Sequence, residues 1–171
     1  MRILSGYELT QAEHWLEEAR QVALRSRCSS SRCGTVIVTQ HGQERIIGSG
    51  FNAPPTGLQE GRYSKNPCRC VRKEELKPLF KSDKTGCMHA EQVAIMDALK
   101  NDPTSLQFSR LYFVRLDDND QIKPSGNPYC TICSKMTLQA GIPEFALIHH
   151  GGNVTVYDSF EYNELSFQYN G

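Results

Sequence analysis

The stretch His89-Ala90-Glu91, taken together with Cys130-Thr131-Ile132-Cys133, decides how this chain is interpreted. One imidazole and two thiolates are three good zinc ligands, and three protein ligands leave a fourth position for water, as in catalytic zinc sites. His89 stands before a predicted helix. Cys130 and Cys133 share one face of the first turn of another, where the positive end of the helix dipole favours thiolates. The pattern predicts a zinc ion held by His89, Cys130 and Cys133.

Each of these residues also has an ordinary structural interpretation. A histidine at a helix start can be satisfied by the backbone, and two cysteines can be buried apolar residues or half of a structural zinc knuckle. Glu91 alone can be a charge at a helix N-terminus. Their joint occurrence favours the catalytic interpretation, in which zinc lowers the pKa of a water molecule to about 7 and Glu91 transfers protons.

The composition limits the class of protein. Lysine plus arginine and aspartate plus glutamate both number 19 in 171 residues, so the formal net charge is zero, whereas a general nucleic-acid binder usually has a basic excess. The length suits one domain, which we expect to span residues 1–171. No apolar run reaches the length of a membrane span, and the N-terminus lacks the apolar core of a secretory signal, so we expect a cytoplasmic protein. Seven cysteines without an export signal favour metal binding over disulfides.

Helical and strand patterns alternate along the chain. Thr10 and Glu13 form a candidate capping box for an amphipathic helix that runs to about Arg25. Strands are predicted at residues 35–39, 45–51, 111–114 and 145–148, with the first two as a hairpin, and helices at 90–99 and 130–140. Residues 154–171 fit a strand, a short helix or both. This order predicts an α/β three-layer sandwich with a mixed central sheet of about five strands and helices on both faces.

Periodicity fails between residues 52 and 86, where prolines and glycines recur. A bare loop of this length is rare in a compact domain. Cys68, Cys70 and Cys87 are candidates to hold this loop in place. We therefore interpret residues 52–87 as a cysteine-containing loop insertion.

The chain resembles the cytidine/deoxycytidylate deaminase superfamily, most closely its deoxycytidylate (dCMP) branch. His-x-Glu followed by Cys-x-x-Cys is similar to the zinc deaminase signature, in which the glutamate is a general acid/base and not a ligand. The matching segments are residues 26–38, 50–55, 88–95 and 128–142. The resemblance implies a cytidine-deaminase-like fold, a catalytic zinc, Glu91 as the catalytic residue and a homo-oligomer.

The resemblance also implies substrate contacts. Asn52, in the family's Gly-aromatic-Asn setting, would bind the sugar hydroxyl, although an asparagine before two prolines is also an ordinary turn residue. The backbone amide of Ala90 would help to position the base and the metal. Basic residues of the loop could contact a substrate phosphate, namely Arg62, Lys65, Arg69 and Arg72. Candidates to stack on a base are the aromatic residues Phe51, Tyr63, Tyr129 and Phe160.

Some dCMP-type relatives carry a second, structural zinc held by cysteines of corresponding segments. Here these cysteines are Cys28, Cys68, Cys70 and Cys87, and four thiolates would form a closed tetrahedral site. The alternative is a set of scattered free thiols. We interpret Cys33 as a core residue.

Two features depart from the family pattern. A proline usually stands directly before the first cysteine, whereas Tyr129 separates Pro128 from Cys130 here, which alters the turn that touches the exocyclic amine. The segment of residues 115–127 is longer than usual and could cover the pocket or form a subunit contact.

The expected function is the zinc-dependent hydrolytic deamination of a cytosine nucleotide or nucleoside in pyrimidine salvage. The leading reaction is the conversion of dCMP to dUMP plus ammonia. One alternative is a deaminase of guanine, adenine, a modified nucleoside or a base in nucleic acid, which the zero net charge disfavours for polynucleotides. Another is a zinc-stabilised interaction module without turnover, for which Glu91 would be unnecessary. The expected partner is a small-molecule nucleotide or nucleoside. No nucleic-acid or membrane partner is expected.

Overall fold

The computed structural model of the chain describes residues 1–28, 31–55 and 87–169. Every helix and strand predicted above is present, with bounds shifted by a few residues. The elements in chain order are β1 (Arg2–Ile3), α1 (Gly6–Ala23), β2 (Cys33–Thr39), β3 (Ile46–Phe51), α4 (Ala90–Asn101), the 3-10 helix η5 (Pro103–Phe108), β4 (Ser109–Leu116), β5 (Ile122–Lys123), α5 (Thr131–Gln139), β6 (Glu144–Ile148), β7 (Val154–Asp158) and α6 (Ser159–Gln168).

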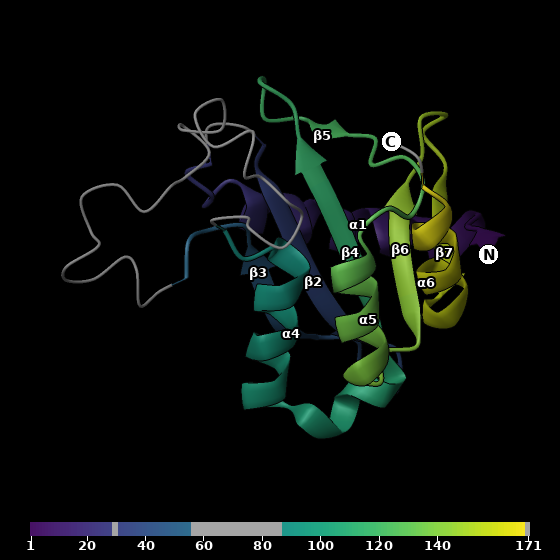
Figure 1. Cartoon of the computed structure of the whole chain (residues 1–171). Coiled ribbons are helices and arrows are strands. Elements are labelled where there is room, and N and C mark those ends of the chain that lie inside the picture. The colour runs from purple at the N-terminus through teal and green to yellow at the C-terminus, as the bar shows by residue number, and fades with distance from the viewer. Residues whose placement is uncertain (29–30, 56–86, 170–171) are drawn as a thin grey trace.

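The strands form one mixed sheet in the order β1-β7-β6-β4-β2-β3, with β5 beside the end of β4 (Figure 1). The β4–β6 pair is parallel and the other pairs are antiparallel, including the predicted β2–β3 hairpin. The sheet has seven strands where about five were expected, because β1 and β5 have only two residues each. Strands this short carry no alternating pattern that a sequence could reveal.

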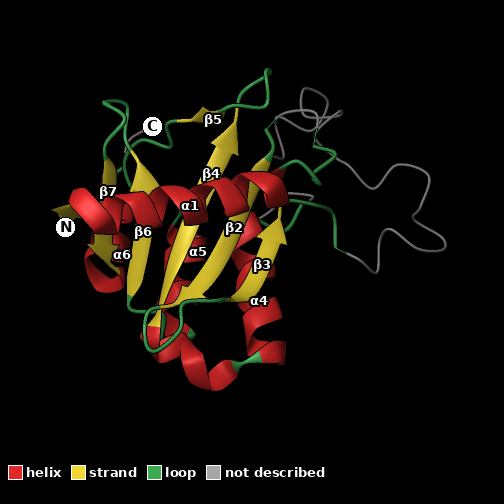
Figure 2. Cartoon of the chain, turned by 180° about the vertical axis from the view of Figure 1, so that it is seen from behind, coloured by secondary structure: helices red, strands yellow, loops and turns green. Residues whose placement is uncertain are grey.

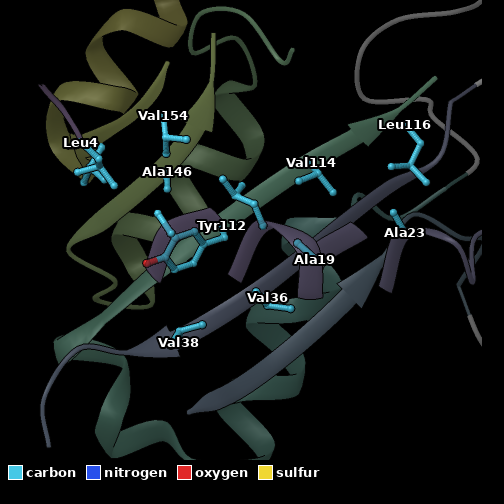
Figure 3. Packing of buried hydrophobic residues seen from close by; sticks show 13 residues of the cluster. Leu4, Ala19, Ala23, Val36, Val38, Tyr112, Val114, Leu116, Ala146 and Val154 are labelled. Atoms are coloured by element: carbon cyan, nitrogen blue, oxygen red, sulfur yellow. The ribbon is translucent and has the colours of Figure 1, made fainter. Parts of the chain in front are cut away.

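Helices cover both faces of the sheet, which confirms the three-layer prediction. Helix α1 crosses one face, and α4, α5 and α6 lie on the other (Figures 1 and 2). Strand β2 serves both layers, because Val36 and Val38 pack in the α1 cluster and Ile37 packs in the α4 cluster. Tyr112 belongs to the α1 cluster, which also contains the small side chains of Ala19 and Ala23 from α1 (Figure 3). No helix among the described residues is both long and apolar enough to cross a bilayer.

The predicted capping box at Thr10 and Glu13 is wrong. The N-cap is Ser5, five residues before Thr10, in an extended conformation. The Thr10 hydroxyl donates to the carbonyl oxygen of Gly6 inside the helix. The N-terminal strand β1 fixes this earlier start, since Arg2 pairs with β7 and also contacts Glu8 of the first helical turn. The pairing with β7 joins residues distant in sequence, so the local capping pattern could not show it.

The segment of residues 154–171 contains both a strand and a helix, β7 and α6. The loop insertion of residues 52–87 lies mostly outside the described residues, which end at 55 and resume at 87. A single domain over residues 1–171 therefore stays a prediction.

Glycines let two helices approach the sheet closely. A Cβ atom at Gly34 would lie 2.2 Å from the carbonyl oxygen of Ala19, and one at Gly50 would lie 2.4 Å from Ala90 O and Ala94 N. Because these neighbours are helix backbone atoms, they cannot move away as a flexible side chain can. The missing side chain at Gly50 therefore sets how closely the start of α4 packs on β3.

We predict that Gly50→Ala destabilises the fold by about 1–3 kcal/mol, because the new methyl group must push α4 away from β3. Urea unfolding followed by circular dichroism measures this. Gly151→Ala is the matched control, since its nearest neighbour would be the Asn153 side chain at 3.7 Å. Equal unfolding free energies for the two variants would contradict the proposed close packing.

Candidate metal centre and active site

The start of α4 is fixed by several contacts. An isolated bridge pairs Met88 with Ala53, and His89 follows as the N-cap residue in an extended conformation. The backbone N–H of His89 donates to Gln92 Oε1 at 2.9 Å, and Gln92 Nε2 lies 3.3 Å from Met136 Sδ on α5. Gln92, which no motif in the sequence singles out, thus links the histidine to the helix that carries the cysteines.

Cys130 is the N-cap residue of α5, and its sulfur accepts from the backbone N–H of Cys133 at 3.4 Å. The ring atom Nδ1 of His89 lies 3.2 Å from Cys133 Sγ and 3.4 Å from Cys130 Sγ. All three ligand atoms lie within 4.8 Å of one another. The two helix starts therefore bring together the three residues that the sequence predicts as metal ligands.

These distances fit a tetrahedral zinc ion. Zinc bonds of about 2.0 Å to nitrogen and about 2.3 Å to sulfur place the two ligand atoms about 3.5 Å apart at the tetrahedral angle. The two observed nitrogen–sulfur distances lie close to this value. The donor set of one imidazole and two thiols is also one that zinc prefers. Both the geometry and the chemistry of the cluster therefore suit zinc.

The thiol chemistry of the cluster also suits a cation. The Cys133 thiol donates to the Cys130 sulfur, and this hydrogen bond together with the contact to His89 lowers the pKa of Cys130 to about 4. The same sharing of a proton, together with burial, raises the pKa of Cys133. One sulfur is thus already a thiolate, and a bound cation would displace the proton from the other.

Glu91 lies in the first turn of α4, beside the ligand cluster, and is only 2% exposed. Burial raises the pKa of its carboxyl to about 7, with the nearby Cys130 sulfur acting in the same direction. A carboxyl group with a pKa near neutrality can both accept and donate a proton at neutral pH. Glu91 thus has the protonation behaviour that an acid/base role requires.

Asn52 follows the last residue of β3 and ties three backbone segments together. Its Oδ1 accepts from the Ser26 hydroxyl and from the backbone N–H of Cys33, both at 2.8 Å, and its Nδ2 donates to Ser31 O at 2.8 Å. The second N–H of the carboxamide has no acceptor among the described residues. Asn52 therefore holds the start of β2 in place and retains one donor.

Arg115 and Tyr129 contact each other, which the sequence does not predict. In the sequence, Arg115 is only the first residue of the long segment 115–127, and Tyr129 is only a candidate to stack on a base. The Arg115 guanidinium donates to the Tyr129 hydroxyl at 2.9 Å and lies 5.5 Å from its ring centroid. Burial and the charge of Glu91 raise the pKa of the Tyr129 phenol. The only sequence signal is a cation within the otherwise apolar run Leu111-Tyr112-Phe113-Val114-Arg115-Leu116.

The segment after β4 is held by two arginines from other parts of the chain. Arg20 of α1 donates to Asp120 O at 2.8 Å, and Arg32 forms an ion pair with the Asp120 carboxylate. These contacts connect residues 117–120 to α1 and to the start of β2. These contacts do not test whether the segment covers the pocket or forms a subunit contact.

Other predicted residues are not members of the ligand cluster or lie outside the described residues. The Arg25 guanidinium carbon lies over the Phe51 ring, 5.1 Å from the ring centroid. Phe160 is 65% exposed on α6. Cys33, which was expected in the core, is half-buried and packs against the α4 cluster. The predicted residues that lie outside the described part of the chain are Arg62, Tyr63, Lys65, Cys68, Arg69, Cys70 and Arg72. The second zinc site of Cys28, Cys68, Cys70 and Cys87 therefore stays a prediction.

Comparison with known proteins identifies the family. Residues 9–149 match the model of the cytidine and deoxycytidylate deaminase zinc-binding region. The chain belongs to this family. Members are hydrolytic deaminases, so this deaminase is an enzyme that cleaves a cyclic amidine C–N bond. Comparison with curated protein sequences finds no match.

Solved structures of deaminases share the fold. The dCMP deaminase of the cyanophage S-TIM5 in complex with dCMP and dUMP is 21% identical, with a TM-score of 0.51, covering 83% of this chain and 82% of the phage chain. Cytidine deaminase from Burkholderia pseudomallei is 18% identical, with a TM-score of 0.53, covering 88% of this deaminase and 94% of the bacterial chain. At these identities the likeness concerns the fold.

We predict that Cys130→Ala lowers the zinc content of the purified deaminase by one equivalent per chain, because two remaining ligands hold zinc poorly. Inductively coupled plasma mass spectrometry measures the content. Cys33→Ala is the control, since this cysteine lies outside the ligand cluster and should leave the content unchanged. An unchanged zinc content in Cys130→Ala would reject the predicted ligand set, and one zinc in the wild-type chain would reject the second site.

Proposed function

We propose that this deaminase converts dCMP and water into dUMP and ammonia. The observation that carries the proposal is the cluster of His89, Cys130 and Cys133 beside a buried Glu91 in a chain of the cytidine and deoxycytidylate deaminase family. The similar cyanophage enzyme was solved with dCMP and dUMP, which makes this pair the first to test. Such a reaction would serve pyrimidine salvage.

In this proposal His89, Cys130 and Cys133 hold one catalytic zinc. Zinc supplies Lewis-acid activation of water at neutral pH when it is bound by three protein ligands with one position open. The placement of both cysteines at the start of α5 stabilises their thiolates through the helix dipole. The capping contact of Gln92 fixes where His89 enters the cluster.

Glu91 moves the protons. It accepts a proton from the attacking water and delivers it to the ring nitrogen next to the amine-bearing carbon, which makes that carbon electrophilic. It then takes the second proton of the added water to the departing amine, which leaves as ammonia, and the carbon retains the oxygen as a carbonyl. A buried carboxyl with a pKa of about 7 suits both directions of transfer.

Two further residues position the substrate. Asn52 would use its remaining amide N–H for the sugar hydroxyl, because its other polar atoms are already bonded to Ser26, Ser31 and Cys33. The backbone N–H of Ala90, at the first turn of α4, would help to orient the base. A homo-oligomer remains a prediction from the resemblance.

We predict that the purified protein releases ammonia from dCMP and that Glu91→Gln lowers kcat by about 10²- to 10⁴-fold, because the amide cannot shuttle protons. Coupled ammonia detection with dCMP, dCTP and cytidine as substrates measures turnover. Glu91→Gln should retain its zinc and its circular dichroism spectrum.

The matched control is Glu13→Gln, which changes an exposed carboxylate on α1 and should leave turnover unchanged. Absence of turnover with all three substrates would reject the proposed reaction. Full activity of a zinc-loaded Glu91→Gln would reject the role of this carboxyl while leaving the reaction itself intact.

A further inference from the structure

Arg115 is a partly buried cation without a carboxylate partner in the part of the chain that the structure describes. Among the described residues no carboxylate forms an ion pair with it, and its Nε atom is buried without a hydrogen-bond partner. A buried charge that lacks a partner is costly, so such groups usually mark a place where a charge is supplied from outside. The other described arginines are either ion-paired or exposed: Arg2, Arg20, Arg32, Arg45 and Arg110 in ion pairs, and Arg25 and Arg27 at the surface.

The groups around the Arg115 side chain hold it in place without neutralising it. The Tyr129 phenol accepts one of its hydrogen bonds at 2.9 Å. Cys33 is its cross-strand partner on β2, and the charge of Arg115 acts on the Cys33 thiol. A phenol and a thiol are both neutral at neutral pH in such surroundings. A guanidinium carries five N–H donors, so some remain for an anion beyond those directed at Tyr129 and Cys33.

Arg115 contacts residues that connect it to the metal cluster and to Asn52. Tyr129, its hydrogen-bond partner, directly precedes the metal ligand Cys130. Cys33, its cross-strand partner, donates its backbone N–H to Asn52 Oδ1 at 2.8 Å. A nucleotide held by the metal cluster and Asn52 would therefore bind next to Tyr129 and Cys33, the two residues that contact Arg115.

We propose that Arg115 is a specificity-determining residue that binds the 5′-phosphate of the substrate. The inference rests on the proposed function, and it assigns the residue by which the enzyme would distinguish a nucleotide from its nucleoside. The base and the sugar are uncharged, so the phosphate is the only anionic group of the substrate. Arginine suits phosphate because its planar fork of N–H groups matches two phosphate oxygens.

The test compares a nucleotide with its nucleoside. Arg115→Gln should raise the KM for dCMP about 10- to 100-fold, the effect of losing a charged hydrogen bond, with a much smaller change in kcat. Its kcat/KM for deoxycytidine should equal that of the wild type. Arg115→Lys should recover part of the loss, because it restores the charge without the fork. The control is Arg45→Gln, which alters an exposed arginine at the opposite end of β2.

Equal losses of kcat/KM for dCMP and deoxycytidine in Arg115→Gln would overturn the inference. A fall in the zinc content or the melting temperature of this variant would also overturn it, because either result indicates a structural role of Arg115 through Tyr129. A wild type that uses deoxycytidine as well as dCMP would also overturn it, while the cytosine deaminase activity would stand. If the wild type turns over neither, the proposed reaction fails. Calorimetric titration with dUMP and deoxyuridine then tests the role of Arg115. The inference requires that the wild type binds dUMP more tightly than deoxyuridine and that Arg115→Gln loses this preference.

Discussion

The close packing of α4 on β3 is the constraint on which the site depends. At Gly50 the helix backbone comes so near to the strand that no side chain fits between them. This contact fixes the first turn of α4, and with it His89 and Glu91. Helix α5 lies on the same face of the sheet and presents Cys130 and Cys133 at its own start. Three ligands from two separate segments can share one ion only because both helix starts are held at the same end of the sheet.

Groups of opposite charge lie next to the cysteine ligands and their neighbours. Glu91 is buried beside the cysteine sulfurs, and this environment holds its pKa near neutrality. Arg115 keeps its charge beside the phenol of Tyr129, the residue next to the metal ligand Cys130. The two groups have different proposed roles, because the carboxyl moves protons at the reacting carbon and the guanidinium selects the substrate. Removing the charge of Glu91 should therefore lower kcat, whereas removing the charge of Arg115 should raise KM.

Much of the fold and of the site could be predicted from the sequence. The β-branched run Thr35-Val36-Ile37-Val38-Thr39 predicts a buried strand. The three-residue spacing of Cys130 and Cys133 predicts that the two sulfurs share one helix face. The two-residue strands could not be predicted, because they form only where a distant strand already lies. Arg115 and the bonds of Asn52 were missed for the same reason, since their partners on β2 and before α5 are set by strand register and not by local pattern.

Anomalous diffraction at the zinc absorption edge from crystals of the wild-type protein tests the proposed metal centre most directly. We predict a peak about 2.0 Å from His89 Nδ1 and about 2.3 Å from both Cys130 Sγ and Cys133 Sγ, with the fourth position facing Glu91 and occupied by water. A cluster without such a peak in zinc-loaded protein, or a peak that Glu91 itself coordinates as the fourth ligand, would contradict the proposal.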